Sequence, residues 1–312
     1  MDKTNLLVTA ARLYYENEYS QNQIAEKLGI SRPYVSKLLS QAKADGIVAI
    51  TINDPNNFES AKSRALREKY GLKRVIIIPE GGEKAKTTAF GAAISRYLNS
   101  VLKSGDIIST SWGNSMYRCT KNLVKKTDLT DITVVQLCGG ISNIGRNIYA
   151  NEVLQNVSQA YDATPYSLPL PAVVDDARVK KVVCNDKNIK SVLDMAEKSR
   201  VALITMGRFG HDNALESAGY ITYDQVEDLK VHGAVGDIWS HIITSDGEIC
   251  DPDLDSRTVG IPLKKMLEKP HRVGVAMDRG RALCTLGAIR GGYINVLIAD
   301  EAVADFLLGE EK

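Results

Sequence analysis

The sequence predicts an α/β protein in two parts: a small winged helical head at residues 1–54, and a Rossmann-like domain with a mostly parallel sheet at residues 55–312. Three observations predict this class. The first fifty residues have the apolar spacing of helices. The later residues alternate between short apolar runs and amphipathic stretches, which is typical of a parallel sheet with covering helices. A turn-rich stretch, residues 54–57, separates the two parts.

Composition excludes several classes of protein. Hydrophobic residues make up 44% of the chain and charged residues 25%, which argues against a disordered or heptad-repeat chain. Lys and Arg number 39 and Asp and Glu number 38, so any nucleic-acid surface must be a local patch. No apolar run approaches the roughly 20 residues of a membrane helix. Asp2 and Arg12 argue against a signal peptide, so we expect a cytoplasmic protein.

Cysteine and histidine show no ligand spacing. The two nearest of the five cysteines are 19 residues apart, and the four histidines form no H-x-x-x-H pair. We therefore expect a reducing compartment, no metal and no cofactor. The chain also has no Walker motif, no G-x-G-x-x-G and no G-x-S-x-G. A binding domain is thus a simpler interpretation than an enzyme.

The head is expected to begin with two helices. Residues 4–17 carry leucine and alanine at helical spacing. Ser20 and Gln23 have the spacing of a capping box, which would begin a short helix ending at Leu28. Gly29 is suited to a left-handed turn directly after that helix.

A third helix would complete a helix-turn-helix. Ser31 is placed to cap it, Pro33 suits its first turn, and Gly46 would end it. Ala25 and Val35 supply the small residue and the β-branched residue that the motif needs on either side of its turn. A generic pair of packed helices is the alternative.

The charge pattern favours DNA binding by this motif. Residues 20–44 contain four Lys or Arg and one acid, whereas residues 1–54 contain six of each sign. We expect residues near the start of the third helix to read bases in the major groove and the others to hold phosphates. Residues 47–53 would form the strand of a wing. The predicted DNA-contacting residues are Gln21, Ser31, Arg32, Tyr34, Ser36, Lys37 and Gln41.

The second part alternates strands and helices. The expected strands are residues 74–79, 107–110, 132–138, 201–207, 272–277 and 295–300, and the expected helices are residues 58–70, 86–103, 115–125 and 149–161. Such apolar strands indicate a parallel sheet covered on both faces, which binds ligands at the carboxyl ends of its strands. We place part of the subunit contact on the helix at 58–70.

The loops expected at these strand ends carry polar groups. S-W-G-N-S, residues 111–115, resembles an anion nest at a helix start, or a plain turn capped by Asn114 or Ser115. Gly139 and Gly140 would allow backbone to approach a ligand closely. Gly207 ends a further strand.

Two charged residues follow later in the chain. Asp237, in an expected loop G-A-V-G-D-I, could accept hydrogen bonds from sugar hydroxyls or cap a neighbouring element. Arg281, at the start of a helix, could close over a phosphate or pair with a surface acid.

Several segments together resemble the SorC family of sugar-binding bacterial transcriptional regulators, and within it the deoxyribonucleoside-regulator branch. They are the helix-turn-helix, S-W-G-N-S-M-Y, V-V-Q-L-C-G-G-I-S, S-L-P-L-P-A-V-V, G-A-V-G-D-I with the R-T-V-G at 257–260, and G-G-Y-I-N-V-L-I-A-D. The resemblance implies a DNA-binding head on an effector domain related in fold to sugar-phosphate isomerases and deaminases. It also implies a tetramer that controls a carbohydrate operon in response to a phosphorylated sugar.

The resemblance places the phosphate loop at residues 111–115, the Gly-Gly loop at residues 139–140 and the acidic ligand contact at Asp237. The predicted effector-binding residues are Ser111, Trp112, Gly113, Asn114, Ser115, Cys138, Gly139, Gly140, Asn151, Gly207, Asp237 and Arg281.

Two departures from the family pattern bear on the effector. Cys138 stands where the family often has a basic residue. The segment A-M-D-R-G-R at 276–281 stands where it commonly has A-G-G-x-x-K, so that Arg281 would replace the lysine while Met277 and Asp278 add bulk and negative charge. The effector could therefore be a phosphorylated or an unphosphorylated sugar, or the pocket could have lost its ligand.

The sequence thus predicts a transcriptional regulator of a carbohydrate catabolic operon, and we expect it to act as a repressor. Its partners would be double-stranded operator DNA and a sugar or sugar-phosphate effector. The resemblance implies a homotetramer, which we expect to be a dimer of dimers. Because symmetric oligomers bind symmetric sites, its operator would be partly palindromic. The alternative is a sugar-phosphate isomerase or deaminase with an added DNA-binding head, which would need a catalytic acid and base that no motif supplies.

Overall fold

The computed structural model describes residues 3–48, 59–140, 148–211 and 213–309. Two compact units divide the chain: a head unit of residues 1–58 with 79–90, and a large unit of residues 59–78 with 91–312. The predicted domain boundary at residue 54 lies outside the described residues. So do residues 49–53 of the predicted wing strand, and residues 47–48 form no strand.

The head contains the three predicted helices: α1 (Lys3–Tyr15), α2 (Gln21–Leu28) and α3 (Arg32–Ala44). Their buried residues, among them Leu7, Ile24 and Val35, form one apolar cluster. The predicted capping box at the start of α2 is present in full, with the Ser20 hydroxyl accepting from the Gln23 amide. Gly29 has a φ of +64°, which glycine adopts without the steric cost of a side chain.

Ser31 occupies the position that precedes α3, as predicted, but its hydroxyl makes no capping hydrogen bond. A capping hydroxyl accepts from the amide of the second or third residue of the helix. The second residue here is Pro33, which has no amide hydrogen, so only the Tyr34 amide could be capped, and Ser31 makes no hydrogen bond to it. The Ser31 hydroxyl is exposed and is therefore left for another partner.

The large unit is built on a seven-stranded sheet in which every described pairing is parallel, as predicted. The strand order is β1-β9-β8-β5-β2-β3-β4. The strands are β1 (Arg74–Ile78), β2 (Ile107–Thr110), β3 (Thr133–Gln136), β4 (Thr164–Tyr166), β5 (Val201–Thr205), β8 (His271–Ala276) and β9 (Val296–Asp300). Central strands such as β5 and β9 are buried along their whole length, which explains their continuous apolar sequences.

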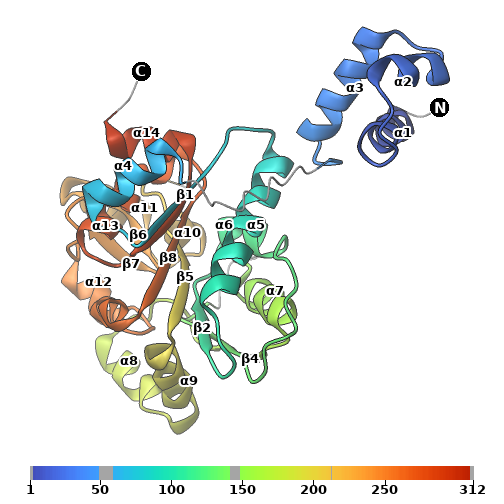
Figure 1. Ribbon diagram of the computed structural model, residues 1–312. Helices are drawn as coiled ribbons and strands as arrows, with labels where there is room; N and C mark the ends of the chain where they lie inside the picture. The colour runs from blue at the N-terminus through green and yellow to red at the C-terminus, as the bar shows by residue number, and fades with distance from the viewer. Residues whose placement is uncertain (1–2, 49–58, 141–147, 212, 310–312) are drawn as a thin grey trace. The chain divides into compact units, whose positions relative to one another are not determined.

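Helices cover both faces of this sheet (Figure 1). Among those packed on strands are α7 on β3 and β4, α9 on β2 and β3, and α14 on β1 and β9. The helices are α4 (Ala61–Tyr70), α5 (Glu83–Val101), α6 (Asn114–Thr120), α7 (Ala150–Tyr161), α8 (Ala177–Cys184), α9 (Lys187–Lys198), α10 (Ala214–Ser217), α11 (Tyr223–Val231), α12 (Pro252–Arg257), α13 (Ala282–Arg290) and α14 (Glu301–Leu308), with 3₁₀ turns η1 (Leu263–Glu268) and η2 (Arg279–Arg281). The helix predicted at 115–125 is shorter than expected and ends at Thr120.

The expectation that G-A-V-G-D-I forms a loop is wrong. Residues 234–238 are strand β6 (Ala234–Ile238), which pairs antiparallel with β7 (His241–Thr244), so that Asp237 lies opposite Ile242. Glycine and aspartate are both unfavourable in strands, which is why the sequence suggested a loop. The hairpin is held instead by burial, because Ile238 and Ile243 belong to the main apolar core.

Candidate functional site

A cavity of about 890 Å³ opens at the carboxyl ends of β2, β5 and β8, three adjacent strands of the sheet. The loop after each strand contributes to it, and the β6–β7 hairpin closes one side. This is the edge at which parallel sheets bind ligands. Its lining residues are Ser111, Trp112, Gly113, Asn114, Ser115, Arg118, Ile148, Tyr149, Thr205, Gly207, Arg208, Asn213, Ala214, Ser217, Ala218, Asp237, Trp239, Ser240, Asp278 and Arg281.

Eight of the twelve predicted effector residues line this cavity. They are Ser111, Trp112, Gly113, Asn114, Ser115, Gly207, Asp237 and Arg281. The structure does not bring Cys138, Gly139, Gly140 and Asn151 to its wall: the cysteine is fully buried, and Asn151 is exposed on α7.

The Gly-Gly loop serves packing in this structure. A Cβ atom on Gly139 would lie 2.2 Å from the carbonyl oxygen of Pro171, and one on Gly140 would lie 3.2 Å from the Trp112 ring. The Trp112 indole N–H donates to the Gly139 carbonyl at 2.8 Å. The two glycines therefore allow close approach to protein backbone and support Trp112, which lines the cavity.

Cys138, directly before the two glycines, is fully buried. Burial raises the pKa of its thiol well above the ordinary value, and the nearby Asp237 carboxylate raises it further. The thiol therefore stays neutral, and it supplies no positive charge in place of the basic residue that the family often has.

Two serines line one wall as hydrogen-bond donors. The Ser111 hydroxyl accepts from the Thr205 amide at 3.3 Å, and the Ser115 hydroxyl accepts from the Arg281 guanidinium at 2.8 Å. Since each oxygen already accepts, its own proton is available to donate into the cavity. The alternative that Asn114 or Ser115 caps α6 is wrong, because the cap residue is Gly113, at a φ of +121°, and no side chain caps the helix.

Arg281 is held by the protein on three sides. Its guanidinium donates to the Asp278 carboxylate at 2.9 Å, to the Ser115 hydroxyl and to the backbone carbonyl of Met206. The predicted pairing with an acid therefore occurs, and the acid is the neighbouring Asp278, which also lines the cavity. Met277, expected to add bulk here, is buried with its sulfur against Cys119 and does not line the cavity.

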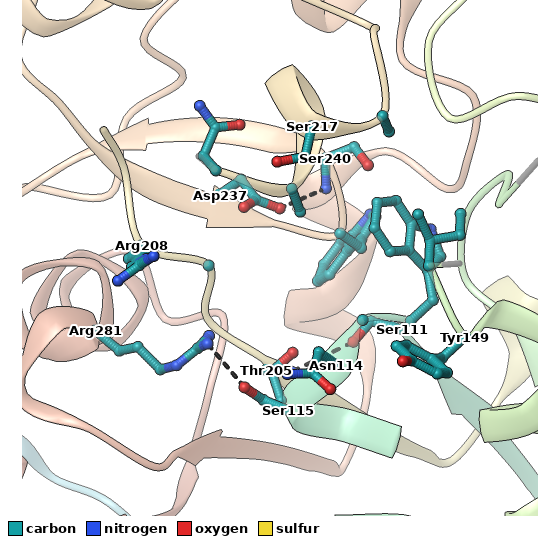
Figure 2. Close-up of a pocket in the computed structure, with 18 of the residues that line it drawn as sticks. Ser111, Asn114, Ser115, Tyr149, Thr205, Arg208, Ser217, Asp237, Ser240 and Arg281 are labelled. Carbon is teal, nitrogen blue, oxygen red and sulfur yellow. Dashed lines mark hydrogen bonds between the residues drawn. The ribbon is translucent and has the colours of Figure 1, made fainter. Parts of the chain in front are cut away.

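Asp237 lies across the cavity from the two serines (Figure 2). Its carboxylate accepts from the Ser240 amide at 3.0 Å. A Cβ on Gly207 would lie 1.8 Å from the Asp237 Oδ1 atom, so only glycine at that strand end leaves space for the carboxylate. Burial raises the pKa of Asp237, against the lowering effects of the Ser240 hydrogen bond and of the electrostatic interactions with Arg281 and His241.

The hairpin turn that carries Ser240 has an unusual backbone. Trp239 and Ser240 have φ values of +37° and +79°, where glycine or asparagine is the ordinary choice. Both residues are buried and both line the cavity. A strained turn that places two side chains at a cavity is typical of a binding site.

Sequence reasoning missed most of one wall. The residues not proposed as ligand contacts are Arg118, Ile148, Tyr149, Thr205, Arg208, Asn213, Ala214, Ser217, Ala218, Trp239, Ser240 and Asp278. Thr205 and Arg208 lie beside Gly207, the predicted end of β5. Their place at a strand end could therefore have marked them as cavity residues. Tyr149, which stacks on Tyr117 with ring centroids 4.4 Å apart, had no signal in the sequence.

The head presents the predicted DNA-contacting residues outside its core. Ser31, Arg32, Tyr34, Ser36, Lys37 and Gln41 are exposed, and Gln21 is half-buried. The Gln41 amide donates to the Asp45 carboxylate at 2.8 Å, so it would have to leave that partner to reach a phosphate.

The described residues contain no group of three side chains that could hold a metal ion. Among them no helix is long and apolar enough to span a membrane.

Comparison with known proteins identifies the family. A family model described as "Putative sugar-binding domain" matches residues 54–309. The chain is 37% identical to the deoxyribonucleoside regulator of Bacillus subtilis over 99% of both chains, and 27% identical to the sorbitol operon regulator of Klebsiella pneumoniae over 98% of both chains. The crystal structure of the full-length Klebsiella regulator matches this structure with a TM-score of 0.74 at 27% identity, over 99% of both chains. The chain therefore belongs to the SorC family of sugar-binding transcriptional regulators, which its sequence motifs had predicted.

Proposed function

We propose that this regulator represses a carbohydrate catabolic operon, and that a sugar or sugar phosphate in the cavity controls its binding to the operator. One observation carries the proposal: the cavity presents hydrogen-bond donors on one wall and a carboxylate on the other. A sugar phosphate has the matching polarity, because its phosphate oxygens accept hydrogen bonds and its hydroxyls donate them.

The ligand would lie with its anionic end at the serine wall and its hydroxyls at Asp237. Ser111 and Ser115 would donate to the anion, and the Asp237 carboxylate would accept from one or two hydroxyls. The names of the relatives, which mention deoxyribonucleosides and sorbitol, support a carbohydrate ligand. We assign no catalytic turnover to the cavity, so sugar phosphates incubated with the protein should be recovered unchanged.

The head would bind double-stranded DNA through α2 and α3. Arg32, Tyr34 and Ser36 would enter the major groove, while Lys37 and Gln41 would hold phosphates. The side chains of Arg32, Ser36 and Lys37 make no hydrogen bond or ion pair with another described residue, which leaves them available to DNA. A homotetramer in the cytoplasm, arranged as a dimer of dimers, would bind a partly palindromic operator, and the effector would act through its differential affinity for two arrangements of the heads.

Replacing Arg32 by alanine tests the DNA part of the proposal. We expect operator affinity to fall by about 1–3 kcal/mol, roughly 5- to 150-fold, because a base contact is lost, while affinity for unrelated DNA falls much less. Fluorescence anisotropy would measure both, using DNA that the wild-type protein selects from a random pool. Arg12→Ala, which removes an exposed arginine of α1, is the matched control and should change neither affinity. Equal specific and nonspecific affinities for Arg32→Ala and wild type would refute the assignment.

A further inference from the structure

The cavity is lined by three arginines, Arg118, Arg208 and Arg281, and their surroundings differ. We propose that Arg208 binds the anionic group of the effector, and that Arg281 is a positioning residue that holds Ser115 for it. This inference rests on the proposed function, because it specifies how the same cavity recognises the charge of its ligand. It reverses the sequence expectation, in which Arg281 closes over the phosphate.

Most of the hydrogen-bonding capacity of Arg281 is already used within the protein. Three of its five N–H donors are committed, to Asp278, Ser115 and the Met206 carbonyl. These partners come from three different segments, so the guanidinium ties the loop after β8, the first turn of α6 and the end of β5 together. Its positive charge is offset at 2.9 Å by the Asp278 carboxylate, and its side chain is only 16% exposed.

The effect of Arg281 on Ser115 is directional. Because the guanidinium donates to the Ser115 oxygen, the hydroxyl hydrogen must point elsewhere, and Ser115 lies at the cavity wall. Arg281 thereby fixes Ser115 as a donor toward whatever occupies the cavity. A phosphate, whose oxygens at full ionisation only accept, is the ligand group suited to that donor.

Arg208 is in the opposite situation. It follows Gly207 at the end of β5, its side chain is exposed, and it makes no hydrogen bond or ion pair with another described residue. Figure 2 shows Arg208 and Arg281 on the same side of the cavity. The stem of Arg208 passes 3.9 Å from the position that a Cβ on Gly280 would occupy, so it lies beside the loop that carries Arg281.

The Arg208 guanidinium, which makes no hydrogen bond or ion pair with another described residue, therefore brings its charge and its five N–H donors to the cavity. Its planar fork can hold two phosphate oxygens at once, which an ammonium group cannot do. Arg118, on α6, interacts within the protein and is not free in the same way. Of these three cavity arginines, Arg208 is the one whose side chain makes no hydrogen bond or ion pair with another described residue.

Isothermal titration calorimetry on the full-length protein tests this assignment. The ligands are ribose 5-phosphate, 2-deoxyribose 5-phosphate, sorbitol 6-phosphate, their unphosphorylated forms and inorganic phosphate. We expect Arg208→Ala to lower affinity for the phosphorylated ligands and for phosphate by about 10- to 100-fold, and to leave free sugars unaffected. Arg208→Lys should recover part of the loss, because it keeps the charge without the fork. Arg290→Ala, at an exposed arginine of α13 outside the cavity, is the matched control.

A double-mutant cycle separates positioning from direct binding. If Arg281 acts through Ser115, the losses caused by Arg281→Ala and Ser115→Ala should be far from additive. The losses caused by Arg208→Ala and Ser115→Ala should instead be close to additive. Circular dichroism and thermal unfolding of each unliganded variant would show whether Arg281→Ala still folds, and Arg281→Lys provides a milder variant if it does not.

The outcomes distinguish this inference from the proposed function. Unchanged phosphate affinity in Arg208→Ala, with a selective loss in Arg281→Ala, would overturn the inference and leave the sugar-phosphate ligand in place. Binding of inorganic phosphate that depends on Arg208, with no binding of any sugar phosphate, would keep the anion site and overturn the proposed ligand class. A wild-type protein that binds neither would overturn both.

Discussion

Replacing Lys269 by methionine is expected to lower the free energy of unfolding of the large unit by about 3 kcal/mol. Only 1% of Lys269 is exposed, and its ammonium donates to the Glu197 carbonyl at 2.9 Å and the Ser199 hydroxyl at 2.8 Å, and to the Ala196 carbonyl. These groups lie at the end of α9, where the carbonyls of a helix have no partner of their own and the helix dipole favours a cation.

Methionine would fill much of the same space and supply no donor. Burial lowers the pKa of Lys269 to about 8, while the nearby Glu197 and Glu268 charges oppose that shift, so the side chain still carries its charge at neutral pH. Urea unfolding followed by tryptophan fluorescence would measure the difference in stability. Lys265→Met, at a solvent-screened lysine of the 3₁₀ turn η1 that precedes Lys269, is the control and should unfold like wild type. A Lys269→Met protein as stable as Lys265→Met would show that the end of α9 needs no such cap.

Replacing Gly207 by alanine is expected to lower effector affinity by about 100-fold, roughly 2.7 kcal/mol. The added Cβ would overlap the Asp237 carboxylate, which lies 1.8 Å from that position, so the carboxylate would have to leave its place opposite the serine wall. Since the proposed ligand uses Asp237 to hold its hydroxyls, both phosphorylated and free sugars should bind more weakly. Ligand titration of the variant by calorimetry measures the loss.

The control for Gly207→Ala is another glycine-to-alanine change. Gly81→Ala adds a Cβ that meets no atom within 4 Å, so it should bind effector like wild type. Asp237→Asn addresses a possible folding defect of Gly207→Ala, because it keeps the size of the side chain and removes its charge. If Gly207→Ala folds and binds effector with wild-type affinity, effector binding does not require the Asp237 carboxylate at its position in this structure.

Much of the fold followed from the sequence because several of its signals are local. The capping box at Ser20, the left-handed Gly29 and the apolar run of β2 each depend on a few neighbouring residues, and each is found as predicted. The loop at 111–115 was found for a related reason. Polar residues directly after a buried strand must lie at the carboxyl edge of the sheet, and that edge is fixed by the parallel topology.

The remaining features depend on contacts between distant segments. Gly139 follows a strand end just as Ser111 does, yet the backbone at Pro171 packs against it. The residues next to Gly139 in the sequence do not predict this contact. Arg208, Asn213, Ala214, Ser217 and Ala218 likewise reach the cavity only through the tertiary fold, which their local sequence does not reveal. Strand β6 was missed because burial of its hairpin outweighs the unfavourable strand preference of Gly236 and Asp237.

The partners of Arg281 likewise could not be predicted from the sequence. The sequence offered a cation at a helix start, with either a phosphate or an acid as its partner. It could not show that Asp278, Ser115 and the Met206 carbonyl would all be within reach of one guanidinium, because these groups come from three separate strand ends. Assigning a charge to a ligand required knowing which arginine already had partners.

A thermal-shift screen of the full-length protein against phosphorylated sugars, free sugars and polyols tests whether the cavity is the effector site. A ligand at 100 times its Kd stabilises the folded state by about 2.7 kcal/mol, which is several degrees in Tm. We expect at least one sugar or sugar phosphate to raise the Tm of wild type, Asp237→Asn to abolish the increase, and Arg32→Ala in the head to retain it. An increase that persists in Asp237→Asn, or no increase with any sugar, would contradict the claim that this cavity is the effector site.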